Sequence, residues 1–468
     1  MIRPETILIN QEDSPLKLKT TSLIIAATLL GSAVMPAHAS NEAMLDLLKV
    51  LRDQGTITAE NYQLLANAAA ADKEKSEATT AEVKAEVKEA TKDIPKITTK
   101  GKIKVTSGDG NWEFQPIGRV MWDYINTNED GSDTDDFTGT ELRRARLGFQ
   151  GKIYDWGYKF EGDFAKDDTA IKDAYVSYGT NVLDDKKLVV KVGQSHIPFG
   201  LNTAISSKYM SFMDRPLFAD TNISPARQSG AMVRLTADDY KWSVNAGYTI
   251  GEIDNGSSDK DDTGDTFSLR GSFIPYMADK NHLIQIGAGY MNVSDDSDDF
   301  RFRQRLVSHK DRTRHINTET ISGYDGSDAF TLDAMGVYGS FHAMAEYLDY
   351  TAEFDSASDV DITAYAVEAG FFLTGESLKW KKGYTSGIKP KSKYGAWQIA
   401  ARFENLDVDG DTTATTDEAD KWSVAVNYYP TQNTRLMLNY DHITDLTKND
   451  ADADFDPSSL KFRAQAYW

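Results

Sequence analysis

The stretch from Glu141 to Gly151, E-L-R-R-A-R-L-G-F-Q-G, constrains the fold more than any other, because polar and apolar residues alternate strictly in it from Arg144 onward. Successive side chains of an extended strand point to opposite faces of a sheet, so the pattern predicts a strand with one polar and one apolar face. In a soluble sandwich the arginines would point to bulk water. In an outer-membrane barrel they would point into the lumen, and the apolar face would meet lipid. Both architectures fit this stretch, and the rest of the chain must decide between them.

The composition excludes several classes of protein. With 26% charged residues and a mean hydropathy of -0.49, the chain is not a bundle of membrane helices. A membrane barrel stays possible, because half of each spanning strand is polar. The net charge of -21 argues against a nucleic-acid partner or an anionic membrane surface. The absence of cysteine removes disulfides and thiolate chemistry.

The N-terminus has the pattern of an export signal. Lys17 and Lys19 precede the apolar run Leu23–Val34, and Ala37-His38-Ala39 follows it. This order predicts a signal peptide over residues 1–39, cleaved after Ala39. The run is shorter than the roughly 20 residues of a transmembrane helix. A buried helix of a soluble domain is the alternative.

Residues 40–95 are predicted to be helical. Their composition is rich in alanine, glutamate and lysine, and Pro95 ends the segment. Apolar residues at Val83, Val87, Ala90 and Ile94 follow a short heptad-like rhythm. The segment is either an oligomerising coiled coil or a loose solvated periplasmic helix, and residues 96–110 are expected to be a linker.

Residues 111–468 predict an all-β, sixteen-stranded antiparallel transmembrane β-barrel, preceded by this helical segment. An even number of alternating segments is typical of bacterial outer-membrane barrels. The segments begin near Trp112, Thr140, Trp156, Ala170, Lys187, Arg227, Tyr240, Asp265, His282, Asp328, Phe341, Asp359, Tyr394, Asp420, Thr434 and Ser459. The last one, Leu460–Trp468, alternates and ends in an aromatic residue, as the closing strand of such a barrel does.

The connections alternate between short and long, which is the asymmetry of periplasmic turns and external loops. The long connections carry most of the acid, for example N-E-D-G-S-D-T-D-D at 128–136. They could bind divalent cations between lipopolysaccharide molecules, or they could be ordinary solvated turns. Thr374–Lys393 breaks the rule, because it is long where a short turn is expected.

Alternation also predicts which charges face the lumen. A charged side chain at the lipid midplane costs about 2–4 kcal/mol, so charged residues should turn inward. The inward arginines are Arg119, Arg144, Arg146, Arg234, Arg270, Arg402, Arg435 and Arg463, and the inward carboxylates are Asp123, Glu161, Asp163, Asp173, Glu368 and Glu404. Arg143 falls on the lipid side, and must lie beyond the membrane band or at a β-bulge that turns it.

Two connections are candidates for the channel interior. His196–Arg227 is long and partly apolar, and connections of this length are usually functional. We expect it to fold inward as a constriction loop, with an external cap as the alternative. In Phe300–His315, Arg301, Arg303 and Arg305 are spaced to form a cationic rail on one face, unless the segment is a surface patch that balances nearby acid.

These residues resemble the phosphate-selective porin family (porins O and P), which are trimeric sixteen-stranded barrels of the outer membrane. The resemblance runs from about Lys100 to Trp468. It rests on segments in the same order: G-R-V-M-W-D-Y at 118–124, L-R-R-A-R-L-G-F at 142–149, F-G-L at 199–201, S-S-K at 206–208, R-F-R-Q-R at 301–305, A-E-Y-L at 345–348, L-T-G-E at 373–376, I-K-P at 388–390 and G-A-W at 395–397.

The resemblance implies an anion channel with an arginine ladder leading to a phosphate site. Arg301, Arg303 and Arg305 match the ladder, and Lys100 and Arg119 match basic positions along the path. The residues that match the site are Arg143, Arg144, Asp173, Ser206 and Ser207. Thr203 stands where the family has a lysine, and Arg146 and His196 stand where it has tyrosines.

The sequence therefore predicts passive, anion-selective diffusion of phosphate or related oxyanions through an arginine-lined pore of a Gram-negative outer membrane. The predicted pore-lining ladder is Lys100, Arg119, Arg234, Arg270, Arg301, Arg303, Arg305, Arg402 and Arg435. The expected partners are these anions, membrane lipid, lipopolysaccharide and two further copies of the chain, without nucleic acid. The alternatives are a general or cation-preferring porin and a structural barrel that tethers the envelope.

An enzyme is not predicted. No nucleophilic triad and no metal-spaced histidine cluster is recognisable among the seven histidines, so no cofactor is expected either.

Overall fold

The computed structural model describes residues 37–90, 92–99, 101–128, 136–165, 169–183, 185–237, 239–253, 264–294, 299–311, 314–410, 417–448, 451–452 and 456–468. Most of the predicted signal peptide lies outside these ranges, and so does Lys100. The chain divides into two units, one up to Ile94 and one from Pro95 to Trp468.

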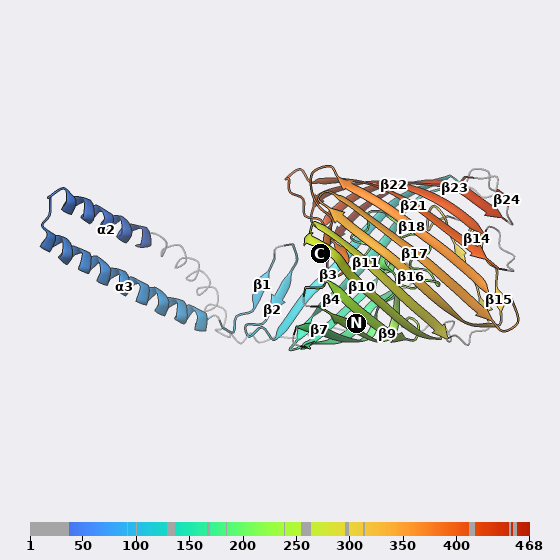
Figure 1. The fold of residues 1–468 in the computed structure, drawn as a ribbon, viewed down its shortest axis with the longest axis horizontal. Coiled ribbons are helices and arrows are strands. Elements are labelled where there is room, and N and C mark those ends of the chain that lie inside the picture. The colour runs from blue at the N-terminus through green and yellow to red at the C-terminus, as the bar shows by residue number, and fades with distance from the viewer. Residues whose placement is uncertain are drawn as a thin grey trace, which may run out of the picture. The chain divides into compact units, whose positions relative to one another are not determined.

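The first unit is a hairpin of two helices, α2 (Ala37–Asp53) and α3 (Ala59–Ala90), which are visible in Figure 1. Gly55 ends α2 with a left-handed φ of 75°, and Thr58 caps α3 by accepting a hydrogen bond from the Asn61 amide at 3.2 Å. The helical prediction is confirmed, whereas association through a coiled coil stays a prediction. Among the described helices, none has the length and apolar character needed to cross a membrane.

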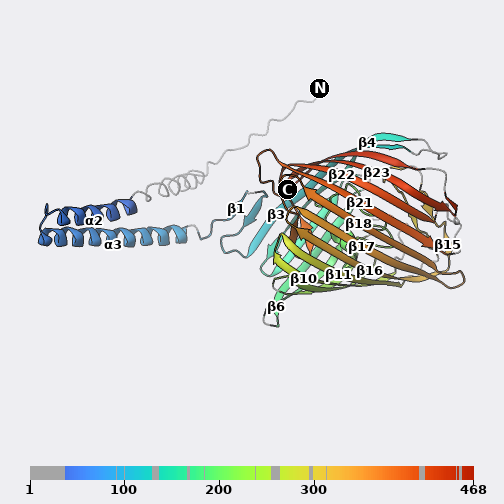
Figure 2. The same ribbon diagram turned by 45° about the horizontal axis from the view of Figure 1, so that its top comes forward.

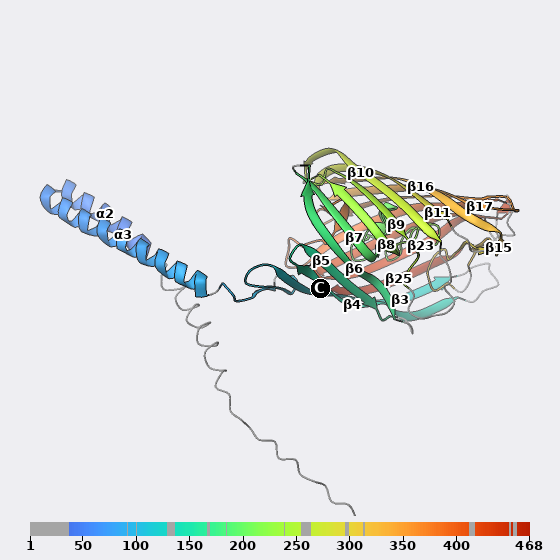
Figure 3. The ribbon, with the colours of Figure 1, turned by 90° about the horizontal axis from the view of Figure 1, so that it is seen from below.

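The second unit is a closed antiparallel barrel, shown from two further directions in Figure 2 and Figure 3. The last long strand pairs with the first, Phe462 opposite Tyr124, which closes the wall. The sixteen long strands are β3 (Trp112–Asn128), β4 (Phe137–Ile153), β5 (Trp156–Asp163), β6 (Ala170–Val182), β7 (Lys186–His196), β8 (Arg227–Thr236), β9 (Trp242–Thr249), β10 (Asp265–Asp279), β11 (His282–Ser294), β16 (Tyr324–Tyr338), β17 (Phe341–Phe354), β18 (Val360–Phe372), β21 (Ala396–Asp409), β22 (Glu418–Thr431), β23 (Thr434–Lys448) and β25 (Ser458–Tyr467). The predicted fold class and strand number are confirmed.

The expected linker at 96–110 is in part a β-hairpin. β1 (Lys96–Thr98) pairs with β2 (Lys104–Thr106), and β2 continues the sheet beside β3 through Val105 opposite Phe114. Asn433 in the β22–β23 turn donates to the Gly101 carbonyl at 3.3 Å. A linker interpretation was wrong for these strands, because the short alternating segments are too brief to stand out from a loop in the sequence.

The barrel has a turn end and a loop end. At the turn end lie two-residue connections such as Tyr154-Asp155, together with the C-terminus, and the long connections lie at the opposite end. The exception, 374–393, contains the hairpin β19 (Lys379–Lys381) and β20 (Tyr384–Ser386). Its Trp380 indole donates to Gln285 Oε1 at 2.8 Å, and Arg234 donates to the Lys382 carbonyl at 2.9 Å. This connection is long because it packs against the inner wall of the turn end.

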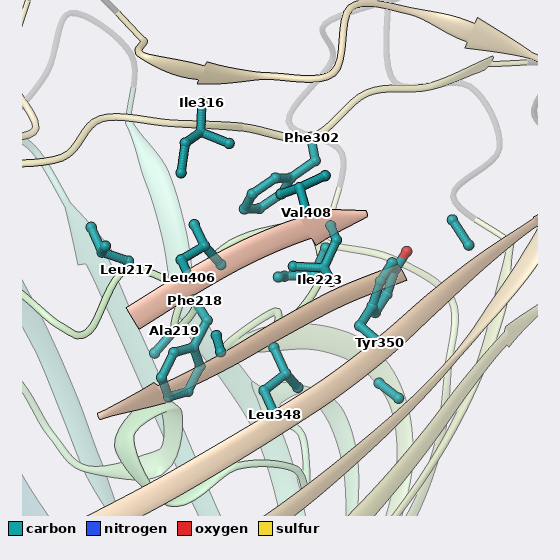
Figure 4. Close-up of a cluster of buried hydrophobic side chains, with 14 of the residues drawn as sticks. Leu217, Phe218, Ala219, Ile223, Phe302, Ile316, Leu348, Tyr350, Leu406 and Val408 are labelled. Carbon is teal, nitrogen blue, oxygen red and sulfur yellow. The ribbon is translucent and has the colours of Figure 1, made fainter. Parts of the chain in front are cut away.

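Part of the inner wall is apolar, which is unusual for a lumen. Inward residues of β17, β18 and β21 form a buried cluster with the loop 299–322, which carries β12 (Asp299–Phe300), β13 (Arg303–Gln304), β14 (Ile316–Asn317) and β15 (Ile321–Ser322). Figure 4 shows Phe302 and Ile316 of this loop with Leu406 and Val408 of the wall. Apolar surface inside a water-filled barrel is unfavourable, so the loop covers it and is a fixed part of the interior.

Replacing Phe302 by alanine should release this loop from the wall. Phe302 is 0% exposed, and truncating a buried phenylalanine costs about 3–5 kcal/mol. Tryptic cleavage after Arg303 or Arg305 in the folded barrel should therefore become roughly tenfold faster or more, because cleavage follows the population of the open form. Phe341→Ala, on the outer face and 47% exposed, is the matched control and should leave the rate unchanged. Equal rates for F302A and the parent would contradict the role of this contact.

Candidate functional site

The connection between β7 and β8, residues 197–226, enters the barrel, as the sequence predicted. Its apolar side chains pack in three buried clusters, with Phe218 and Ile223 in one, Leu201 and Met210 in another, and Phe212 in the third. A four-residue helix, α4 (Leu201–Ala204), begins against β17, where the carboxylate of Glu346 accepts the Leu201 and Asn202 amides at 2.6 and 2.7 Å. We call residues 197–226 the inward loop.

Wall side chains hold the inward loop by its backbone carbonyls. Each donor comes from a strand between β21 and β25, and each acceptor lies between Lys208 and Asp214. The pairs are Gln465 to Lys208 at 3.2 Å, Arg435 to Met210 at 2.5 Å, Asn427 to Ser211 at 2.8 Å, Arg463 to Met213 at 2.8 Å and Arg402 to Asp214 at 3.1 Å. The three bonds from arginines are charge-assisted and belong to the stronger hydrogen bonds in proteins, so the loop has a fixed path across the lumen.

Several arginines that were predicted to face the lumen, four of them in the predicted ladder, therefore have a structural role. Arg402 pairs with Glu404 at 2.7 Å and Arg463 with Asp123 at 2.6 Å, and both also hold the inward loop. Arg270 forms a bidentate pair with Asp333 and is buried. Arg435 anchors Met210, and Arg234 binds the turn-end hairpin. The sequence placed all five inside the barrel correctly, but their guanidinium groups are occupied by protein acceptors.

Arg143 lies at a β-bulge, one of the two positions that the sequence allowed. Met121 of β3 pairs with Arg144 and Trp122 pairs with Leu142, so Arg143 is the extra residue. The bulge turns its side chain inward, where it lines a cavity together with Arg144. The Nε groups of both arginines have no hydrogen-bond acceptor, and an Nη of Arg144 donates to the Met121 sulfur at 3.8 Å. Neither forms an ion pair with a carboxylate of the described residues.

We call this space the arginine cavity; it has a volume of about 170 Å³. Its walls come from β4, the inward loop, the loop 299–322 and β22. The charged and titratable residues that line it are Arg143, Arg144, Asp214, Arg215, Asp220, Arg305, His309 and Lys421. A planar guanidinium with unused donors binds oxyanions bidentately, so the cavity has the chemistry of an anion site.

The inward loop has two carboxylates, Asp214 and Asp220, and nearby basic side chains stabilise the ionised form of each. Although burial opposes ionisation, the ammonium of Lys461 and the ring of His309 hold the pKa of Asp214 well below its ordinary value. Against the same effect of burial, Arg215 lowers the pKa of Asp220 to about 2. Among the described residues, no group of three or more histidine or carboxylate side chains could hold a metal ion.

A second basic group lies around Arg119. Its guanidinium donates to Ser207 Oγ at 3.0 Å and to Ser206 Oγ at 3.5 Å, and it pairs with Glu161 at 2.8 Å. We call Arg119, Ser206, Ser207 and Glu161 the serine–arginine cluster. Burial lowers the pKa of the adjacent Lys208 to about 7, and Arg119 acts in the same direction.

Three more of the predicted site residues lie near this cluster: Arg146, Asp173 and His196. Arg146 pairs with Asp163 at 2.7 Å and Asp173 with Lys159 at 2.7 Å, whereas the buried Nδ1 of His196 has no hydrogen-bond partner. Thr203 lies apart from them, buried in α4 with its hydroxyl 3.0 Å from Ser224 Oγ.

The predicted rail is split by the apolar packing of Phe302. Arg301 and Arg303 are exposed on the other side of that chain segment, where Arg301 donates to Asn317 at 2.9 Å, and Arg305 lines the arginine cavity. Lys159, Arg215, Arg227 and His309 were not among the predicted site residues. Alternation with Glu161 and Asp163 could have found Lys159, but the positions of Arg215 and His309 depend on how two loops fold.

Comparison with known proteins places the barrel among porins. A family model described as phosphate-selective porin O and P matches residues 114–468. An uncharacterized protein of Caulobacter vibrioides is 27% identical over 361 residues, covering 74% of this chain and 71% of its own. The anion-selective porin from Comamonas acidovorans has a similar fold, with a TM-score of 0.53, 12% identity, and coverage of 76% of this chain and 100% of that one. The outer membrane channel DcaP of Acinetobacter baumannii gives a TM-score of 0.50, 12% identity, and coverage of 77% and 98%.

Removing one anchor of the inward loop should loosen it. Arg435→Met keeps the side-chain volume but loses the bonds to Met210 and Gln465. A hydrogen bond to a charged group contributes about 1.5–3 kcal/mol, so amide exchange over residues 208–214 should become roughly tenfold faster or more. Hydrogen exchange with mass spectrometry measures this. Arg52→Met, in the helical unit, is the control for the same chemical change, and unchanged exchange in R435M would show that this anchor is dispensable.

Proposed function

The chain belongs to the phosphate-selective porin O and P family, and we propose that it carries phosphate or related oxyanions across the outer membrane by passive, anion-selective diffusion. The observation that supports this most directly is the bulge in β4, which directs Arg143 and Arg144 into the arginine cavity without carboxylate partners among the described residues. Elsewhere in the described lumen, arginines such as Arg270 and Arg463 are neutralised by a carboxylate.

Two groups of basic residues lie against different parts of the inward loop. The arginine cavity lies against Asp214–Thr221 of the loop, and the serine–arginine cluster lies against Ser206 and Ser207. An oxyanion in the cavity would meet the guanidinium forks of Arg143 and Arg144, and one at the cluster would meet hydroxyl donors beside Arg119. Conduction needs several sites that bind an ion weakly enough to release it. Because Glu161 already pairs with Arg119, an anion would bind only weakly at the serine–arginine cluster.

We propose that the loop end faces the exterior and the turn end the periplasm, because long connections lie outside in barrels of this kind. The helical unit would then lie in the periplasm, and lipid and lipopolysaccharide would surround the barrel. The family resemblance also supports a homotrimer. The predicted signal peptide over residues 1–39 fits export to this membrane.

The ion pairs in the lumen favour one other function, a general or cation-preferring porin. Glu161, Asp163 and Asp173 all lie inside and bind Arg119, Arg146 and Lys159, so the net field there is smaller than the number of bases suggests. A structural barrel that tethers the envelope would instead be closed to small solutes, which liposome swelling measures.

The double variant R143Q/R144Q tests the proposal. In planar bilayers with a salt gradient, the parent should prefer chloride over potassium, and phosphate should reduce the chloride current by competing for the sites. The variant removes two cations from the cavity, so the anion-to-cation permeability ratio should fall roughly fivefold and the phosphate effect should weaken. Arg52→Gln in the helical unit is the matched control. A parent channel that prefers potassium, or a double variant with the parent's selectivity, would rule the proposal out.

A further inference from the structure

We infer that His309 is a specificity-determining residue, which neutralises two carboxylates, Glu141 and Asp214, at the border of the arginine cavity. The inference rests on the proposed anion channel and adds a control of its selectivity by pH. Three separate parts of the chain meet at this residue: β4 supplies Glu141, the inward loop supplies Asp214, and the loop 299–322 supplies His309 itself.

The imidazole lies between the two carboxylates. Its Nε2 contacts Glu141 Oε1 in a short hydrogen bond, and its Nδ1 lies 3.7 Å from Asp214 Oδ1. The His309 side chain is 27% exposed and lines the cavity, so it can exchange protons with the water of the lumen. A protonated imidazole donates from both nitrogens and would interact with both carboxylates at once.

The position of the imidazole is fixed by the turn that carries it. Lys421 donates to the Leu306 carbonyl at 3.1 Å, and Lys461 donates to the Val307 carbonyl at 2.8 Å. Within the turn, the Val307 and Ser308 amides donate to Asp311 Oδ2 at 3.0 and 2.8 Å. The ring is therefore held against Glu141 and Asp214 by the barrel wall and does not hang from a free loop.

Other cations also act on the two carboxylates. Glu141 has Lys310 at 3.4 Å, and Asp214 has Lys461 at 2.7 Å, although Lys461 is shared with Asp441 at 2.9 Å. Arg143 interacts electrostatically with both carboxylates, but lysine and arginine ordinarily stay charged near neutral pH, whereas histidine is the side-chain type whose charge changes there. Arg143 and Arg215 line the same cavity, so excess negative charge here would oppose an anion that approaches them.

The identity of this residue sets the direction of the pH effect. A lysine at this position would be charged throughout, whereas a histidine exists in a charged and a neutral form. With a proton on the ring, His309 neutralises the two carboxylates and anion preference should be high. With a neutral ring, which high pH favours, anion preference should be lower.

The test measures chloride-to-potassium permeability ratios between pH 5 and pH 8. Lys208 titrates in the same range, so the comparison uses the Lys208→Gln background. There, the ratio should rise roughly threefold from pH 8 to pH 5, the size expected for one added charge close to a water-filled path. K208Q/H309Q should lose this response, because glutamine fills the position without titrating. K208Q/H309K should hold the high ratio at both pH values.

A fourth variant keeps the test decisive if a His309 substitution disturbs folding, which heat-modifiable electrophoretic mobility would report. K208Q/E141Q/D214N retains the imidazole and removes the carboxylates, so its ratio at pH 8 should already exceed that of K208Q, and an unchanged ratio at pH 8 would contradict the inference. An anion-selective channel whose pH response survives in K208Q/H309Q would overturn the role of His309 alone. A parent channel that is not anion-selective at any pH would instead overturn the proposed function.

Discussion

A peptide segment that crosses the inside of a barrel must have its backbone polar groups satisfied there, and this requirement organises the lumen. The inward loop meets it through donors on the wall, with Arg435, Arg463 and Arg402 bound to the carbonyls of Met210, Met213 and Asp214. Conversely, carboxylates of the wall accept its amides, as Glu404 does for Leu217 at 2.8 Å. Charged residues in this barrel therefore have two distinct uses. Some hold the constriction in place, and others, such as Arg143 and Arg144, keep unused donors toward the cavity.

The position of the cavity follows from the apolar part of the inner wall. The loop 299–322 and the inward loop cover the inner faces of β17, β18 and β21, where Leu348, Ile362 and Leu406 are buried. The serine–arginine cluster lies on another part of the wall, where Arg119 of β3 pairs with Glu161 of β5. At the turn end, the hairpin β19–β20 fills part of the interior through Trp380. The interior is thus lined by folded segments that enter from both ends as well as by the strands.

Period-2 alternation was sufficient to predict the sixteen strands and the inward direction of Arg119, Arg270 and Arg402, because a strand has only two faces. It also showed that Arg143 does not fit the alternation of inward and outward residues. Alternation cannot reveal what an inward side chain binds, since Asp123 and Arg463 are 340 positions apart in the chain and meet only because β25 closes on β3. It equally cannot separate an apolar residue that faces lipid from one that faces a covering loop. For that reason the apolar inner wall, the hairpin at 374–393 and the contact of His309 with Glu141 were beyond the sequence.

Because of the bulge at Arg143, the inward-facing residues of β4 have even numbers on one side of it and odd numbers on the other. Beyond it, even-numbered residues such as Arg144 and Arg146 face inward, while before it the inward residue opposite Asp123 is the odd-numbered Glu141. Insertion or deletion of one residue on either side would exchange the lumen-facing and lipid-facing side chains of that half strand. Insertion or deletion of two residues would preserve their directions. Length variation among natural relatives in this strand should therefore come in steps of two, or be accompanied by the gain or loss of the bulge itself.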